Sequence, residues 1–111
     1  MGNVIGVTFI AVAAIQVLGT IAFLVNAGRL LQRLEDRHKL VHESMGSPSL
    51  IMNNTPRNNV LFLRWIWNRD FRTLDDPKSM ALASFVRTLL VSLLFGLAVL
   101  IALFVAVTVT L

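Results

Sequence analysis

Three side chains of the kinds that bind metal ions lie close together in the polar middle of the chain. Glu35, His38 and His42 recur at spacings of three and four residues, which places them on one face of a helix. Two histidines four residues apart on a helix can ligate a metal ion. Glu43 is adjacent, but this face is highly charged and no further strong ligand is obvious. The favoured interpretation is a solvated or headgroup-facing patch, and a metal site is the alternative.

A second group combines arginines with aromatic residues. It consists of Arg64, Trp65, Trp67, Arg69, Phe71 and Arg72. Such composition occurs in proteins that bind single-stranded nucleic acid. It also occurs at membrane surfaces, where tryptophan favours the boundary of the bilayer and arginine attracts anionic headgroups. The apolar character of the rest of the chain favours the membrane. We therefore expect these residues to bind anionic lipid headgroups or another membrane subunit, and not nucleic acid.

Other signs of chemistry are missing from the sequence. The chain has no Cys, so a thiolate metal site and a cysteine nucleophile are excluded. It contains no phosphate-binding loop, no G-x-S-x-G and no H-E-x-x-H. No carboxylate lies in either apolar end block, which argues against a proton-relay transporter. We expect a non-enzymatic protein without a cofactor.

The distribution of charge predicts the elements that carry these residues. All ten basic and all six acidic residues lie between Arg29 and Arg87, and residues 1–28 and 88–111 carry none. A bilayer core of about 30 Å is crossed by about 20 helical residues. In lipid the backbone groups must be paired within the segment, so these blocks are expected to be helices. The predicted fold is an all-α membrane protein with two transmembrane helices, 1–28 and 88–111.

The segment between these helices is predicted to be cytoplasmic, because basic residues that flank membrane spans stay on that side. Both termini then lie on the opposite side. In chain order we expect a cytoplasmic extension of the first helix (29–45), a loop (46–59), an interfacial amphipathic helix (60–74) and the cytoplasmic start of the second helix (75–87). Gly46, Pro48 and Pro56 mark the loop, and Asp76 before Pro77 is a typical helix start.

Both predicted spans carry residues suited to helix packing. Gln16 lies near the middle of the first span, where its amide needs a hydrogen-bond partner on a neighbouring helix. In the second helix small residues recur four apart, at Ser84, Thr88, Ser92 and Gly96. Small side chains let helix backbones approach closely. We expect this face to contact protein.

Part of the chain resembles a known family. Trp65-Ile66-Trp67, then Phe71-Arg72, then Asp75-Asp76 and an arginine entering the second span (Arg87) resemble universal stress protein B, a small bacterial inner-membrane protein with two terminal spans. The resemblance covers about residues 60–87 and the order of the spans. It implies a bacterial inner-membrane location and a stress-linked role, and it implies no catalytic residues.

Two helices alone bury little surface, so we expect an accessory or structural subunit of a larger membrane complex, such as a respiratory or photosynthetic assembly. Two alternatives remain. One is a free stress-related membrane protein like the family above, and the other is a small homo-oligomeric pore. A pore needs a polar stripe along the second span, and that span offers only a short one.

Overall fold

The computed structural model describes residues 2–47 and 55–110, and in these ranges every regular element is a helix. The elements are α1 (Gly2–Arg37), α2 (Lys39–Ser44), α3 (Pro56–Trp67), the 3₁₀ helix η1 (Asp70–Thr73) and α4 (Pro77–Thr110). The prediction of an all-α fold is therefore confirmed for the described residues. α1 and α4 are each long and apolar enough to cross a membrane.

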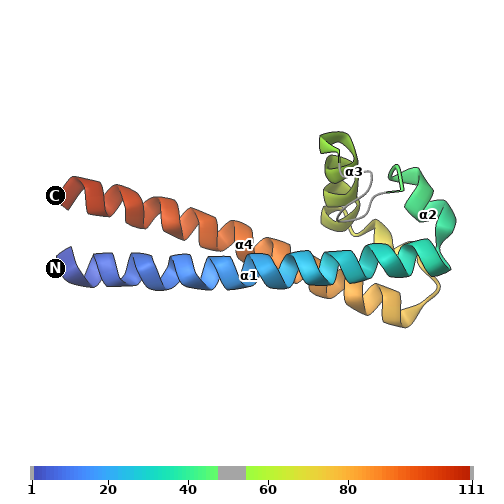
Figure 1. Ribbon diagram of the computed structural model, residues 1–111, viewed down its shortest axis with the longest axis horizontal. Helices are drawn as coiled ribbons and strands as arrows, with labels where there is room; N and C mark the ends of the chain where they lie inside the picture. The colour runs from blue at the N-terminus through green and yellow to red at the C-terminus, as the bar shows by residue number, and fades with distance from the viewer. Residues whose placement is uncertain (1, 48–54, 111) are drawn as a thin grey trace.

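α1 and α4 form an antiparallel pair, with both ends of the chain at the same end of the molecule (Figure 1). Phe9 lies beside Phe104, Gln16 beside Leu93, and Arg33 beside Ser79. The sum of the paired residue numbers stays nearly constant, so one register holds along the whole pair. The 34 residues of α4 rise about 51 Å at 1.5 Å per residue, close to the 54 Å length of the molecule.

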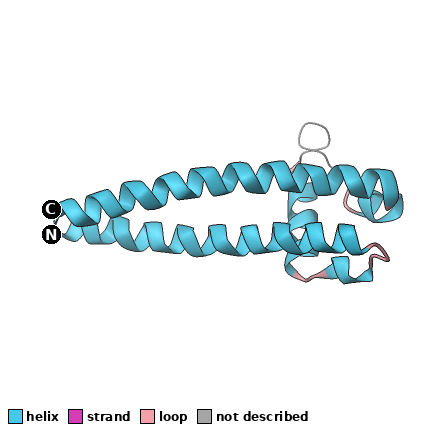
Figure 2. Ribbon diagram, turned by 90° about the horizontal axis from the view of Figure 1, so that it is seen from below, coloured by secondary structure: helices cyan, strands magenta, loops and turns pink. Residues whose placement is uncertain are grey.

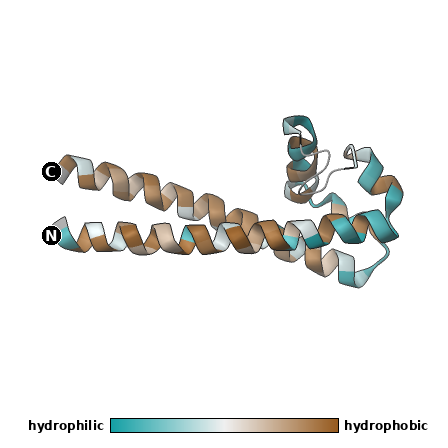
Figure 3. Cartoon of the chain, in the orientation of Figure 1, coloured by the Kyte–Doolittle hydropathy of each residue, from teal (hydrophilic) through white to brown (hydrophobic). Residues whose placement is uncertain are grey.

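The pair divides into two parts, which we call the stem and the head. The stem is residues 3–26 of α1 with 91–109 of α4. The head is the rest of both helices together with α2, α3 and η1. The stem is apolar over nearly its whole surface and the head is mixed (Figure 3). Figure 2 shows that α2, α3 and η1 are all gathered at the head end.

The head has a hydrophobic core because apolar residues recur at helical spacing on three helices. α1 contributes Ala27, Leu30, Leu31 and Leu34, α3 contributes Phe62, Trp65 and Ile66, α4 contributes Ala83 and Val86, and Met45, Phe71 and Leu74 close the core. Leu30, Leu34, Ile66 and Val86 are completely buried. Each such side chain contributes about 1.5–3 kcal/mol through its removal from water. The core therefore holds α3 across the helix pair.

The predicted extension 29–45 is helical, with one break. α1 passes through Gly28 without interruption, and its regular geometry ends at His38, where φ is −137° and ψ is 57°. α2 then runs for six residues, ends at Ser44 and is capped by Met45. The break turns α2 away from the axis of α1 (Figure 1) and allows Met45 to be buried in the core.

The segment predicted as one interfacial helix, 60–74, is divided in the structure. α3 begins earlier, at Pro56, because the Thr55 side chain accepts from the Asn58 backbone N–H at 3.2 Å. It ends at Trp67. Arg69 has the left-handed conformation, with φ at 58°, which a right-handed helix cannot include, so η1 follows as a separate turn. Of the predicted loop 46–59, residues 48–54 lie outside the described residues.

Candidate functional site

The cluster of arginines and aromatic residues lies at the junction of α3, η1 and α4, and its members occupy three environments. Trp65 and Phe71 belong to the core, with only 8% and 5% of their surfaces exposed. Their rings meet edge to face at 5.8 Å between centroids, and Phe62 stacks on the other side of Trp65 at 6.4 Å. These two aromatic residues pack in the core of the head.

Arg64 and Trp67 lie in the second environment, an apolar hollow between α3 and α4. Its volume is about 490 Å³, and its lining consists of Val60, Leu63, Arg64, Trp67, Asn68, Leu90 and Leu94. Half of the Trp67 surface is exposed. α3 lies across the long axis of the helix pair (Figure 1), so its exposed apolar side chains share this hollow with the beginning of the apolar part of α4.

The third environment is a hollow of about 280 Å³ that contains three arginines. We call it the positive hollow; it is lined by Arg69, Phe71, Arg72, Ser84, Arg87 and Thr88. The sequence grouped two of these arginines with Arg64, but the structure replaces Arg64 by Arg87 of α4. The Arg87 guanidinium lies over the Trp67 ring at 5.7 Å, and its Nε–H donates to the Trp67 carbonyl at 3.4 Å.

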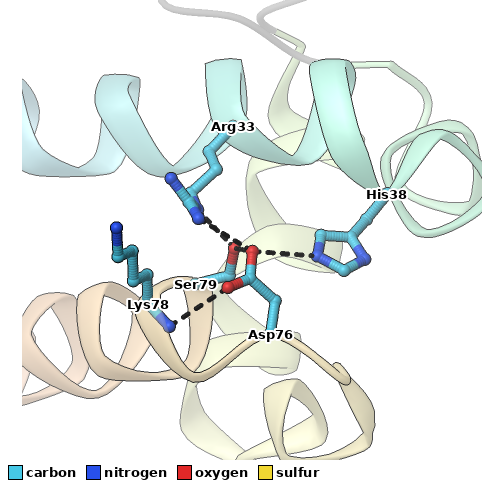
Figure 4. A network of polar contacts seen from close by, with 5 residues as sticks. All are labelled: Arg33, His38, Asp76, Lys78 and Ser79. Carbon is cyan, nitrogen blue, oxygen red and sulfur yellow. Dashed lines mark hydrogen bonds and ion pairs between the residues drawn. The ribbon is translucent and has the colours of Figure 1, made fainter.

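A polar network that the sequence did not reveal joins α1 to the start of α4 (Figure 4). Arg33 Nη2 donates to Asp76 Oδ2 at 2.9 Å, and Arg33 Nε donates to Ser79 Oγ at 2.5 Å. The Ser79 hydroxyl donates to the same carboxylate oxygen at 2.6 Å. The other oxygen, Oδ1, accepts from the Lys78 backbone N–H at 3.1 Å and caps α4. Of these contacts, the sequence alone predicted only the capping of α4 by Asp76.

The network lowers the pKa of the Asp76 carboxyl below its ordinary value. The hydrogen bond from the Ser79 hydroxyl is the largest cause, and the Arg33 hydrogen bond and positive charge act in the same direction. Asp76 is therefore ionised at neutral pH, and it neutralises Arg33, whose side chain is 23% exposed. This arrangement clamps α4 to α1 next to the core.

Asp76, His38 and Ser79 are the residue types of a hydrolytic triad, but their geometry does not activate a nucleophile. Ser79 is completely buried, and its hydroxyl donates to Asp76 and not to a histidine. His38 Nε2 lies 3.7 Å from Asp76 Oδ2 and has no hydrogen-bond partner. A triad requires the histidine to lie between serine and aspartate. Here the aspartate lies between the other two, so the group is structural.

The structure does not bring the predicted metal ligands together. Glu35 is exposed, His42 is buried, and His38 lies at the break between α1 and α2 and faces Asp76. Within residues 2–47 and 55–110 no three side chains of His, Cys, Asp or Glu are grouped as metal ligands. The break at His38 removes the regular helical spacing on which the metal alternative depended.

Two of the predicted packing residues meet in the stem. Gln16 Nε2 donates to the Leu93 carbonyl at 3.0 Å, and the Gln16 amide fills the space beside Gly96. A Cβ atom added at Gly96 would collide with this amide, so the glycine makes room for it. Ser84, Thr88 and Ser92 are exposed instead and do not face α1.

Comparison with protein-family models, with curated proteins and with solved structures found no match for this chain. The resemblance to universal stress protein B therefore stays a prediction. Two features of the chain itself point to a function, namely the largely uncovered stem and the positive hollow of the head.

Proposed function

We propose that this protein is a non-enzymatic integral membrane protein that serves as an accessory subunit of a larger membrane assembly. α1 and α4 span the bacterial inner membrane, and the head, including residues 29–87, faces the cytoplasm. The observation that carries the proposal is the state of the stem: none of its described residues is buried by the fold. Lipid or other protein must cover it.

One side of α4 is suited to protein rather than to lipid. In the stem, Ser92, Ala98 and Ala102 are exposed, and at 100° per residue they lie within about a third of the helix circumference, on both sides of the exposed Phe95. We call this side the small face. In a bilayer, helix association depends on close packing, which small residues allow. The small face does not contact α1, so it is free to pack against the helix of another subunit.

The polar side chains of the head, and several of those in the stem, support a structural role. Arg33, Asp76 and Ser79 bind one another, and Ser79 is inaccessible. Asn26 Nδ2 donates to the Ala22 carbonyl, and Thr20 Oγ1 donates to the Gln16 carbonyl, so these polar side chains of α1 are satisfied within the helix. The arrangement stabilises a rigid head on two membrane helices.

Purification of the tagged full chain from the membranes of its native cells, in mild detergent, tests the proposal. We expect a defined complex in which the chain and its partners are stoichiometric by mass spectrometry. Ser92→Phe on the small face should release the chain from this complex, whereas Leu97→Phe, at an exposed position outside that face, should not. A chain that migrates alone contradicts the proposal, and a ring of identical chains would support a pore instead.

The orientation is tested separately, because the chain has no cysteine of its own. A Lys39→Cys variant carries a single thiol at an exposed position of the head. An impermeant thiol reagent should label it only after the cells are opened. Labelling in intact cells would reverse the assigned orientation without affecting the argument about the stem.

A further inference from the structure

The positive hollow brings together three cationic side chains from two elements. Arg69 directly precedes η1 and Arg72 lies within it. Arg87 comes from α4, fifteen residues beyond Arg72. Like charges at close range repel one another unless an anion or solvent compensates them. A fold that gathers three guanidinium groups at one hollow therefore favours a bound anion there.

No carboxylate in the described part of the chain neutralises the arginines of the positive hollow. Among the described residues, the guanidinium groups of Arg69 and Arg72 form no hydrogen bond and no ion pair, and the carboxylate bridges that do form involve only Asp76. Asp70 lies between the two arginines in sequence, but it is exposed and bridges neither of them. Arg87 uses Nε on the Trp67 carbonyl, which leaves its terminal nitrogens for another acceptor.

Two hydroxyl groups complete the lining. Thr88 donates its proton to the Ser84 carbonyl at 3.0 Å, whereas the Ser84 hydroxyl donates to no group in the described part of the chain. The hollow therefore offers guanidinium and hydroxyl donors, with no carboxylate among its lining residues. Phosphate suits such a site, because its several oxygens accept hydrogen bonds from more than one arginine.

The apolar hollow lies next to the positive one, on the side toward the stem. Arg87 contacts Trp67, which lines the apolar hollow together with Leu90 and Leu94 of α4. Leu94 lies seven residues, or about 10 Å, beyond Arg87 along the helix and toward the apolar end. A ligand that fits both hollows has a negatively charged group and an apolar chain within that distance.

We propose that Arg69, Arg72 and Arg87 form a binding site for the phosphate of an anionic phospholipid, with an acyl chain of the same lipid in the apolar hollow. Arg87 is the last charged residue before the apolar run, so the site lies at headgroup level once α4 crosses a bilayer. The site rests on the membrane location in the proposed function, but not on the accessory-subunit role.

Native mass spectrometry of the full chain tests the site. The protein is released in mild detergent that contains equal amounts of phosphatidylglycerol and phosphatidylcholine, and the lipid retained by each variant is measured. The wild type should retain phosphatidylglycerol in preference. Since a basic residue near an anionic membrane contributes about 1 kcal/mol, Arg69→Gln and Arg72→Gln should each lower this retention roughly fivefold.

Arg57→Gln is the matched control. It removes the same charge from an exposed position in the first turn of α3, which lines neither hollow. It should change the retention less than twofold. Arg87→Gln also removes the contact with Trp67 and could destabilise the head for that reason. The variants of the exposed Arg69 and Arg72 therefore decide the test. An Arg69→Gln/Arg72→Gln double variant that retains as much phosphatidylglycerol as Arg57→Gln would overturn the site.

Inorganic phosphate distinguishes the two sources of the anion. Added in excess, it should displace phosphatidylglycerol only weakly, because it cannot occupy the apolar hollow. Displacement as effective as that by soluble phosphatidylglycerol would overturn the lipid as the ligand. The membrane location in the proposed function is tested separately. Extraction of the chain from native membranes by alkaline carbonate would contradict that location, whatever lipid the purified protein retains.

Discussion

The head and the stem are built from the same two long helices, but different interactions hold them. In the head, apolar side chains from α1, α3 and α4 exclude solvent from one another, and an ion pair adds a clamp beside them. In the stem no described residue is buried, and the contacts include one interhelical hydrogen bond, from Gln16, and one aromatic pair, Phe9 with Phe104.

This difference fits the proposed environments of the two parts, which are water around the head and lipid around the stem. In water, burial of apolar surface provides the main stabilisation, so the head needs a core. Between helices in lipid that driving force is absent, and close packing with a few hydrogen bonds has to suffice. Ile66 and Leu34 of the head are stabilised by burial, whereas Gly96 and Gln16 of the stem contribute close packing and a hydrogen bond. Substitutions in the two parts should therefore differ in size.

Ile66→Ala should have the largest effect on stability. The side chain is completely buried in the head, and its truncation leaves a cavity that costs about 2–5 kcal/mol. Denaturant unfolding of the full chain in mild detergent measures the loss. Ile10→Ala is the matched control, because 68% of Ile10 in the stem is exposed, and it should change stability by less than about 0.5 kcal/mol. Equal losses would contradict the difference between the two parts.

Asp76→Ala should have the next largest effect. It removes the cap of α4 and leaves the partly buried Arg33 without its anion. Asp76→Asn keeps a capping oxygen and should therefore be less destabilising. The unfolding midpoint should fall in the order wild type, Asn variant, Ala variant. Asp75→Ala removes an exposed carboxylate one residue earlier and should leave the midpoint close to that of the wild type.

Acid should remove the electrostatic part of this clamp. The pKa of Asp76 is lower in the folded chain than its ordinary value of 3.8, so the folded state binds fewer protons than the unfolded state. The stabilisation is complete above pH 3.8 and is lost as the pH falls through the lowered pKa. The difference in unfolding midpoint between the wild type and Asp76→Asn should therefore shrink in acid. A difference that is independent of pH would show that the charge of Asp76 contributes nothing.

Substitutions between the stem helices should have the smallest effect. Gly96→Leu displaces the Gln16 amide, and Gln16→Leu removes its hydrogen bond to Leu93. Interhelical hydrogen bonds in membranes average about 0.6 kcal/mol, so pairing should decrease roughly threefold. Cross-linking between cysteines introduced for Phe9 and Phe104 reports the pairing, since the chain has no cysteine.

Gly6→Leu is the control for the stem substitutions. Nothing lies within 4 Å of a Cβ atom added at Gly6, so the same increase in size should leave the cross-linking rate unchanged. If Gly96→Leu lowered the free energy of unfolding by more than Ile66→Ala does, the stem and not the head would determine the fold.

The fold class was predictable because it depends on hydropathy and charge, which are sums over the residues of a segment. Residues 1–28 and 88–111 carry no charge, and this alone indicates two long helices. The environment of the aromatic residues was harder to predict. Trp65 and Trp67 are two residues apart and chemically identical, yet one is 8% exposed and the other 50%. Their difference depends on which side of α3 faces the core.

The candidate site could be predicted only in part, for a related reason. Arg69 and Arg72 were identified from their neighbours in the sequence, but Arg87 joins them across fifteen residues, and Arg33 meets Asp76 across 43. Every arginine between residues 29 and 87 was an equal candidate for such contacts. No local pattern ranks them, because each contact requires a particular register between helices.

The amino-acid sequence by itself determined that this chain forms long apolar helices with all of its charge between them, because hydropathy and helical periodicity are sums over neighbouring residues. The tertiary structure decided which polar side chains meet. The break at His38, the left-handed turn at Arg69 and the register of α1 against α4 place Arg33 on Asp76 and three arginines around one hollow. Packing of the head core selects these geometries, and packing depends on residues that are far apart in the chain.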